Sequence, residues 1–390
     1  MSRFSRTDRS FLGRWWWTVD RGLLAAFLAL AVLGVILVAS ASPAVAERIG
    51  LEPYHFLKRH LVMLLPALLL MLGVSMLEPR QLWRLASLLF VASLCAMVAV
   101  LFTGMEIKGA QRWLHVAGLS IQPSEFAKPA FAICAAWFMA LQKKRENFPG
   151  NRVAAGLYLA YISLLLLQPD LGMTVIVTSL WAAQIFLAGF PFRLLIIFVA
   201  VAAIGLGTAY LAFDHVHSRI NRFLDPESGD NYQVERSLEA FQNGGMFGTG
   251  PGQGTVKLTI PDAHADFIFA VGAEELGFIF TAVLMALYGF IVVRGFRRGM
   301  QSDDIFPVLA VGGLLTMLGL QATVHMGSAL NVLPAKGMTL PFISYGGSSI
   351  LSVGFTAGAI LCLTRWQGRA SIARGGLSLR PAQAEAKNTV

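Results

Sequence analysis

Apolar stretches long enough to cross a lipid bilayer recur along almost the whole chain. Of its 390 residues, 56% are hydrophobic and only 14% are charged, which is too apolar for an ordinary soluble domain. A helix that crosses the hydrocarbon core needs about 20 consecutive apolar residues. The pattern therefore predicts an all-α polytopic membrane protein with about ten transmembrane helices.

The expected spans divide the chain into a basic tail (1–19), a membrane domain (20–366) and a flexible tail (367–390). The spans themselves are 20–43, 58–77, 82–104, 122–142, 153–169, 171–189, 192–213, 266–293, 305–327 and 348–366. A connection of unusual length, 214–265, separates spans seven and eight. No convincing internal repeat is visible, which disfavours a transporter built from inverted repeats.

The distribution of basic residues predicts which way the helices run. With the N-terminus in the cytoplasm, most of the 31 Lys and Arg residues fall in the inner segments, as the positive-inside rule requires. Both termini are then cytoplasmic, and the long loop 214–265 is periplasmic. Basic residues at the membrane edge also explain the net charge of +9 without a nucleic acid partner. The three cysteines lie within spans, so neither a disulfide framework nor a cysteine metal site is expected.

Charged residues gather where the even-numbered spans begin, which this topology places at the outer face. Span four opens with Pro123, which suits a first helical turn. Glu125 and Lys128 follow on one helix face and can pair. Span six begins after Asp170, a good helix cap. Span ten opens after Ser344–Ser349, where two glycines permit a tight turn and a serine can cap. Each feature has a purely structural reading, as an internal salt bridge or a cap.

Asp266 stands at the start of span eight, where a carboxylate is costly to dehydrate and so has a function or a partner. The neighbouring His264 and the apolar residues that follow Asp266 are more than a cap requires. If the helix begins there, Glu274 lies within about 80° of Asp266 around the helix axis, whereas Glu275 lies nearly opposite. Glu274 is therefore the better candidate to support Asp266 without itself contacting the substrate.

Convergent helix N-termini would create an anion site at this outer face. Their free N–H groups and positive half-dipoles favour phosphate. Arg112, Lys128 and Lys336 would add positive charge, as would Arg219 and Arg222 of the long loop. Such a pocket suits a lipid with a diphosphate headgroup, and the residues expected to bind this substrate are Arg112, Glu125, Lys128, Asp170, His264, Lys336 and Ser348. Lys336 also fits an ordinary snorkelling lysine.

The long loop contains the glycine-dense stretch 244–255. It lacks the Gly-Lys-Ser/Thr ending of a phosphate-binding P-loop. Long loops without structure are uncommon unless they are functional. We therefore expect a lid over the pocket or the floor of a groove.

Four motifs in this order resemble the SEDS family (shape, elongation, division and sporulation). They are Gly109–Trp113 with Gln122–Lys128, then Gln168–Gly172, then His264–Ala270, and finally Pro334–Ser349. The likeness covers about residues 20–366, and the last motif resembles the division branch more than the elongation branch. Ala265 and Ala335 stand where the family often has Thr, which leaves any role for a hydroxyl at these positions in doubt.

The resemblance implies a peptidoglycan glycosyltransferase that polymerises lipid II at the outer face of the bacterial inner membrane, at the division septum. It also implies a class B penicillin-binding protein, a transpeptidase, and other division proteins as partners. By match to the family motif, Asp266 is the catalytic aspartate. No cofactor is certain, although a divalent cation (Mg or Mn) can share the work at the diphosphate.

The hypothesis is a single inverting displacement in which Asp266 accepts a proton from the attacking sugar hydroxyl. Two alternatives remain open. A lipid II flippase would use the same cationic pocket but needs a polar route to the cytoplasm, and few ionisable residues lie deep in the spans. A scaffold without chemistry would tolerate replacement of Asp266 and Lys128.

Overall fold

The protein is a helical bundle, seen here in a computed structural model that describes residues 10–107, 110–116, 119–145, 147–191, scattered positions between 193 and 223, 232–334 and 337–365. The helices are α1 (Phe11–Thr18), α2 (Arg21–Arg48), α3 (His55–Ser75), α4 (Pro79–Thr103), α5 (Pro123–Lys144), α6 (Gly150–Leu167), α7 (Leu171–Leu187), α10 (Tyr232–Gly244), α11 (Ile268–Gly299), α12 (Ile305–Ala329) and α13 (Gly347–Leu363), with a short 3₁₀ helix η2 (Val256–Leu258). Each predicted span except the seventh coincides with one of these helices. The seventh, 192–213, lies largely outside the described residues.

The helices begin where the sequence supplies an N-terminal signal. The carboxylates of Asp20, Asp170 and Asp304 accept hydrogen bonds from the first-turn backbone of α2, α7 and α12. Pro79 and Pro123 stand in the first turn of α4 and α5, where a missing N–H costs nothing. The predicted cap at Asp170 is thus confirmed.

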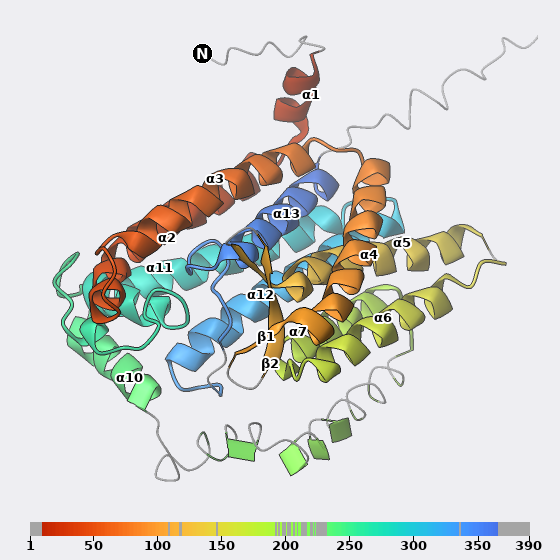
Figure 1. Cartoon of the computed structure of the whole chain (residues 1–390). Helices are drawn as coiled ribbons and strands as arrows, with labels where there is room; N and C mark the ends of the chain where they lie inside the picture. The colour runs from red at the N-terminus through yellow and green to blue at the C-terminus, as the bar shows by residue number, and fades with distance from the viewer. Residues whose placement is uncertain are drawn as a thin grey trace, which may run out of the picture.

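The helices are apolar and long enough for a membrane. Six of the described helices (α2, α3, α4, α6, α11 and α12) have the length and composition to cross a bilayer, while α7 and α13 are shorter apolar helices. The polytopic all-α class is confirmed. The buried residues of helix α5 run without a large gap from Pro123 to Ala140. It packs against α4, α6, α7, α12 and α13 and forms the centre of the bundle (Figure 1).

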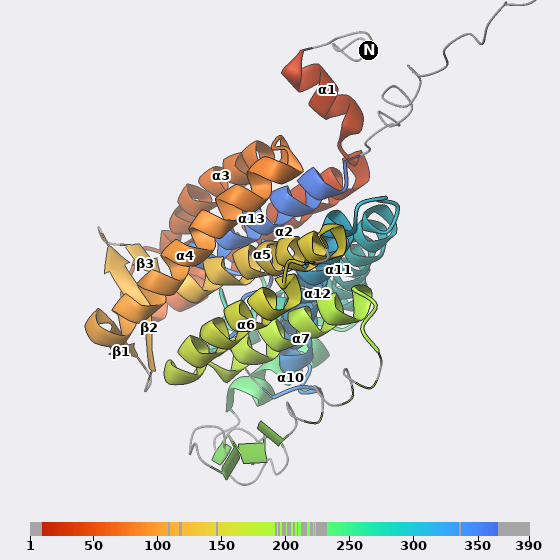
Figure 2. The same cartoon turned by 90° about the vertical axis from the view of Figure 1, so that its right-hand side faces the viewer.

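A small antiparallel sheet lies at one end of the bundle, and the sequence reasoning did not predict it. Strands β1 (Met105–Ile107), β2 (Ala110–Val116) and β3 (Leu119–Ile121) pair in the order β1-β2-β3. Figure 2 shows this sheet and helix α1 at opposite ends of the molecule. Helix α1 lies within the predicted basic tail 1–19. Strand β2 carries Arg112 toward the helix starts described below.

The long loop is partly folded, because it contains α10 and η2. Its glycine-rich part fits into a break in α11 at Gly277, which has φ 79°. The N–H groups of Thr249 and Gly250 donate to the carbonyls of Glu274 and Glu275. Backbone hydrogen bonds therefore fasten this segment to α11. A lid would instead be free to move.

Gly277 can only be glycine in this arrangement. A side-chain carbon there would come within 2.5 Å of backbone atoms of Met246 and Gly248, and its φ lies in the region that other residues avoid. The N–H groups on the far side of the break, on Phe278 and Ile279, donate to carbonyls of Gly245 and Met246. The backbone groups released by the break thus find partners in the loop.

Candidate active site

The starts of α5, α7, α11 and α13 are joined at one end of the bundle. The backbone N–H of Gln122, just before α5, donates to Oγ of Ser348 on α13 over 3.1 Å, and its side-chain amide lies 3.4 Å from Oδ2 of Asp170. The N–H of Tyr345, just before α13, donates to the carbonyl of His264, which precedes α11. The predicted convergence of these helix starts is therefore present.

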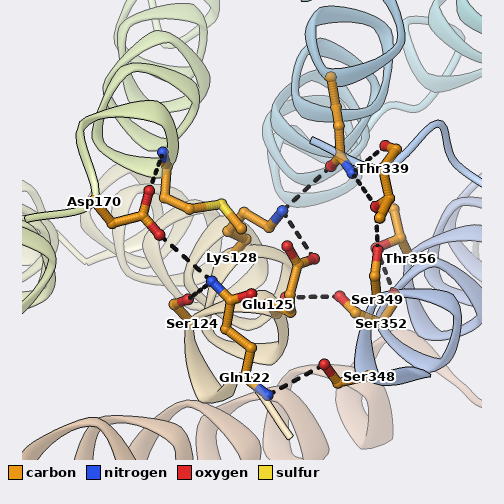
Figure 3. Close-up of polar contacts among 12 residues, drawn as sticks. Gln122, Ser124, Glu125, Lys128, Asp170, Thr339, Ser348, Ser349, Ser352 and Thr356 are labelled. Carbon is orange, nitrogen blue, oxygen red and sulfur yellow. Dashed lines mark hydrogen bonds and ion pairs between the residues drawn. The ribbon is translucent and has the colours of Figure 1, made fainter. Parts of the chain in front are cut away.

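A buried ion pair lies at the centre of this region. Nζ of Lys128 is 3.0 Å from Oε2 of Glu125, and their side chains are 1% and 8% exposed. The same ammonium donates to Oε1 of Gln321 on α12, whose amide in turn donates to the carbonyl of Thr339. Figure 3 shows this chain of contacts from α5 to the segment before α13. The expected pairing of Glu125 with Lys128 is present.

A small cavity adjoins the ion pair. Its volume is about 10 Å³, near the minimum that one water molecule occupies. The lining residues come from α5, α12, α13 and the preceding segment: Glu125, Lys128, Met317, Leu318, Gln321, Pro341, Ser352, Val353 and Thr356. Lys128 thus faces a space far smaller than a substrate. A direct contact between Lys128 and a diphosphate would require this network to open.

Arg112 reaches from strand β2 to the turn before α7. Its guanidinium donates to the carbonyls of Gln168 and Pro169 and lies 3.7 Å from Oδ1 of Asp170. The side chain is 31% exposed. Arg112 therefore fastens the sheet to α7 and still presents charge at the surface.

No serine caps α13, although the sequence predicted that a serine within 344–349 can do so. Helix α13 starts after Gly346, and no side-chain hydrogen bond caps it. The hydroxyl of Ser348 instead accepts the N–H of Gln122, so it links two helix starts. The physical reason is that Ser348 already lies inside the first turn, beyond the cap position.

Asp266 lies in a turn before α11, which begins at Ile268. Its N–H donates to the carbonyl of Asp262 over 3.0 Å. No side chain caps α11, so Asp266 does not serve as the cap of this helix. The residue is half-buried, and its carboxylate lies against Gly337, where an added side-chain carbon would be 3.1 Å from Oδ2. This contact brings the motifs around Asp266 and Gly337 together.

His264 forms the wall beside this turn. Its ring stacks on Phe56 with centroids 3.9 Å apart, and Tyr345 lies 5.1 Å away. Burial lowers the pKa of His264 to about 4, and Arg48 acts in the same direction against the carboxylate of Asp262. The imidazole is therefore neutral at physiological pH in this arrangement, and its predicted part in binding the substrate stays a prediction.

Glu274 has a different set of neighbours from those that the helix geometry suggested. The expectation assumed a continuous helix from Asp266, but the helix begins two residues later. The carboxylate of Glu274 accepts from Asn243 and from the N–H groups of Val256 and Lys257, over 2.7–2.9 Å. These contacts hold the long loop, and support of Asp266 by Glu274 stays a prediction.

Lys336, Arg219 and Arg222 lie outside the described residues, so their predicted roles stay predictions. The structure also adds residues that sequence reasoning missed, namely Gln122, Gln321, Thr339 and Ser352. Gln321 offered a signal, since an amide within an otherwise apolar span is costly unless it is hydrogen-bonded.

No group of three or more His, Cys, Asp or Glu side chains is arranged to bind a metal among the described residues. A magnesium ion carried by a diphosphate needs only one or two protein carboxylates. The predicted involvement of Mg or Mn therefore stays a prediction.

Comparison with known proteins gives consistent matches over nearly the whole chain. The family of cell cycle proteins FtsW, RodA and SpoVE matches residues 21–367. A probable peptidoglycan glycosyltransferase FtsW from Caulobacter vibrioides is 46% identical over 363 residues, covering 93% of each chain. A protein of the same description from Coxiella burnetii is 36% identical, covering 88% of this chain and 96% of the relative.

Two solved structures have a similar fold. One is a chain from a peptidoglycan synthase complex that coordinates polymerization and crosslinking, with a TM-score of 0.73 and 31% identity over 89% of this chain and 97% of that one. The other is the rod shape determining protein RodA of Thermus thermophilus, with a TM-score of 0.67 and 30% identity over 90% and 99% of the two chains.

Proposed function

The chain belongs to the FtsW, RodA and SpoVE family of cell cycle proteins and is a peptidoglycan glycosyltransferase of the FtsW type; we propose that it polymerises lipid II with Asp266 as general base. The contact between the Asp266 carboxylate and Gly337 carries this proposal. This contact brings together two motifs that lie far apart in the sequence. The carboxylate at their junction is half-buried, so it is held in place and still within reach of substrate, as a general base must be.

The reaction is a single displacement at an anomeric carbon. A sugar hydroxyl of one lipid II attacks the anomeric carbon of a glycan that is still attached to undecaprenyl diphosphate. The new glycosidic C–O bond forms as the bond to the diphosphate oxygen breaks, and the configuration inverts. Asp266 takes the hydroxyl proton, and the diphosphate leaves with the bonding electrons. General-base help of this kind is worth about 10²–10⁴ in rate.

The leaving diphosphate needs positive charge. Arg112, which is partly exposed at the joined helix starts, and Lys336 are the assigned cations, together with the N–H groups of those starts. Lys128 is buried and already bonded to Glu125 and Gln321. Its role in this scheme is to hold α5, α12 and the segment before α13 in register, or to meet substrate after that network opens.

The site faces the periplasm in this proposal, at the outer leaflet of the inner membrane. The opposite end of the bundle supports that orientation. There Asp20 bonds to both Arg294 and Arg298, and basic residues favour the cytoplasmic side. A class B penicillin-binding protein is the proposed partner, other division proteins are further partners, and the division septum is the proposed location.

A lipid II flippase is the function that the comparisons do not favour. The described contacts also favour the enzyme over the flippase. The joined helix starts lie at one end of the bundle, and the adjoining cavity, with a volume of only about 10 Å³, is too small for a headgroup to pass. Vesicles that contain the purified protein separate the two functions. Glycan polymer from lipid II indicates the enzyme, and headgroup translocation without polymer indicates a flippase.

Replacing Asp266 by Asn tests the base directly. Polymerisation by the purified protein should fall by about 10²–10⁴ while the protein stays folded, because the amide cannot accept the proton. Asp262→Asn is the matched control, since it makes the same change in the same turn and should remain active. Full activity of Asp266→Asn would reject the assignment.

A further inference from the structure

Helix α12 holds the segment before α13 by its backbone carbonyls. Gln321 and His325 lie one turn apart on the same face of α12. The amide of Gln321 donates to the carbonyl of Thr339 over 2.9 Å, and Nδ1 of His325 lies 2.6 Å from the carbonyl of Met338. Two consecutive carbonyls of the segment are thus bound by two consecutive turns of one helix.

The contact to Met338 fixes the form of the His325 ring. A carbonyl oxygen can only accept, so Nδ1 carries the proton and donates it. The ring is 1% exposed, and its Nε2 has no hydrogen-bond partner among the described residues. A buried nitrogen without a partner is costly. The fold thus accepts this cost for a ring whose one described hydrogen bond goes to Met338.

Met338 follows Gly337, whose backbone lies beside the Asp266 carboxylate. An added side-chain carbon at Gly337 would lie 3.1 Å from Oδ2 of Asp266, so the backbone of this segment forms part of the surroundings of the carboxylate. A shift of the Met338 carbonyl would move Gly337 with it, because the two residues are adjacent in the chain. The hydrogen bonds from Gln321 and His325 on α12 therefore set the position of this segment relative to the Asp266 carboxylate.

We propose that His325 is a positioning residue for the glycosyltransferase, which holds the 337–339 backbone in place against Asp266 through its Nδ1–H. The inference rests on the proposed function of Asp266 as base. It assigns His325 no contact with substrate. Its effect reaches the reaction through the backbone of Met338 and Gly337.

The two nitrogens of the ring can be tested separately. The amide of Asn places an N–H close to where Nδ1 lies, whereas the longer Gln places it near Nε2. His325→Leu removes both. Each variant is purified at full length, its thermal unfolding in detergent is measured, and kcat and KM for polymer formation are determined per folded molecule. Amide hydrogen exchange is followed over 334–345 in the same samples.

Loss of the contact should lower kcat in His325→Leu by about 10–100-fold, since small misplacements at a reacting centre have effects of that size. Exchange at 337–340 should become about fivefold to tenfold faster, as expected when one buried hydrogen bond is lost. His325→Asn should restore both quantities, whereas His325→Gln should restore neither.

Three outcomes would overturn the proposal. The first is equal rescue by Asn and Gln, since the effect would then not depend on Nδ1. The second is unchanged exchange in His325→Leu. The third is faster exchange with unchanged kcat, because the backbone would then move without effect on the reaction. Failure of the proposed function would give a different result. Asp266→Asn would then be fully active, while the effects of the His325 variants would be unchanged.

Discussion

Two buried lysine–carboxylate pairs occupy different regions of the molecule, and their surroundings differ. Lys128 pairs with Glu125 within the bundle, and Lys257 pairs with Glu275 where the long loop meets α11. All four side chains are at most 8% exposed. By burial and charge alone, the two pairs look alike.

Their further contacts separate them. Lys128 continues to Gln321 and the cavity, and through Gln321 to Thr339. From there the backbone leads to Gly337 and Asp266. Among the described residues, the ammonium of Lys257 continues to Ser40 on α2, where it donates to a carbonyl and a hydroxyl. The first pair is linked to the proposed base, whereas the second fastens a loop to two helices.

A buried charge therefore does not by itself mark a functional site. Buried ion pairs are costly to desolvate and are weak evidence for stability. What distinguishes Lys128 and Glu125 is their connection, through side chains that share a cavity, to a half-exposed carboxylate. The same double replacement in each pair tests this distinction.

The largest effect is expected at the first pair. Glu125→Leu alone should lower the free energy of unfolding by about 3–5 kcal/mol, because it leaves the Lys128 ammonium buried without its carboxylate. The double variant Glu125→Leu/Lys128→Met should regain most of that stability, since both charges are gone. It should nevertheless lose polymerisation by about tenfold or more, because Gln321 loses a partner and the segment that it holds is displaced.

The double variant Glu275→Leu/Lys257→Met is the matched control. We expect it to be folded and to polymerise at a rate close to that of the unaltered protein. Denaturant unfolding in detergent and polymerisation per folded molecule are measured for both doubles. Equal losses of activity in the two would mean that the regions do not differ in the way their contacts indicate.

Acid should destabilise the packing of His264 beside Asp266. This pH dependence provides a second test of the region around the proposed base. Burial lowers the pKa of His264 from 6.5 to about 4. Between these values the unfolded chain binds the proton more readily than the folded one. The contribution of His264 to the free energy of unfolding is therefore fully present above pH 6.5. It is lost as the pH falls toward 4, which lowers the free energy of unfolding by about 3 kcal/mol.

His264→Phe supplies the comparison for this pH dependence, because a phenyl ring can keep the stacking on Phe56 without titrating. Denaturant unfolding of both proteins between pH 7 and 4 measures the difference. We expect the slope that His264 contributes to vanish in the variant. A slope that survives unchanged would assign the acid sensitivity to other groups.

The sequence predicted the helices well because membrane spans are specified locally. Length and apolar composition mark each span, and residues such as Pro123 and Asp170 mark where helices begin. The same local logic found the Glu125–Lys128 pair, which lies within a single helical turn. It could not find Gln321, because that amide acquires its role only when α12 packs beside α5.

The errors have a common physical origin in the segments between helices. The eighth span was expected to be helical from Asp266, but Asp266 lies in a turn and α11 begins at Ile268. The helical angle inferred between Asp266 and Glu274 therefore does not hold, whereas support of Asp266 by Glu274 stays a prediction. A serine was expected to cap α13, but Gly346 occupies the cap position and no side chain bonds there. The sheet that carries Arg112 had no pattern strong enough to reveal it. In each case tertiary contacts fixed the backbone, and no local residue preference signalled them.

The smallest of these effects is expected at Glu274, and it decides between the two roles considered for this carboxylate. Glu274→Gln keeps the shape of the side chain but turns one acceptor oxygen into an N–H₂ group. One of the three donors around it, Asn243 or the N–H of Val256 or Lys257, then faces another donor. The free energy of unfolding should fall by about 1–3 kcal/mol, with little change in kcat per folded molecule, because the described contacts of Glu274 belong to the loop. A fall in kcat with an unchanged free energy of unfolding would instead indicate that Glu274 supports Asp266, as the sequence predicted, rather than the long loop.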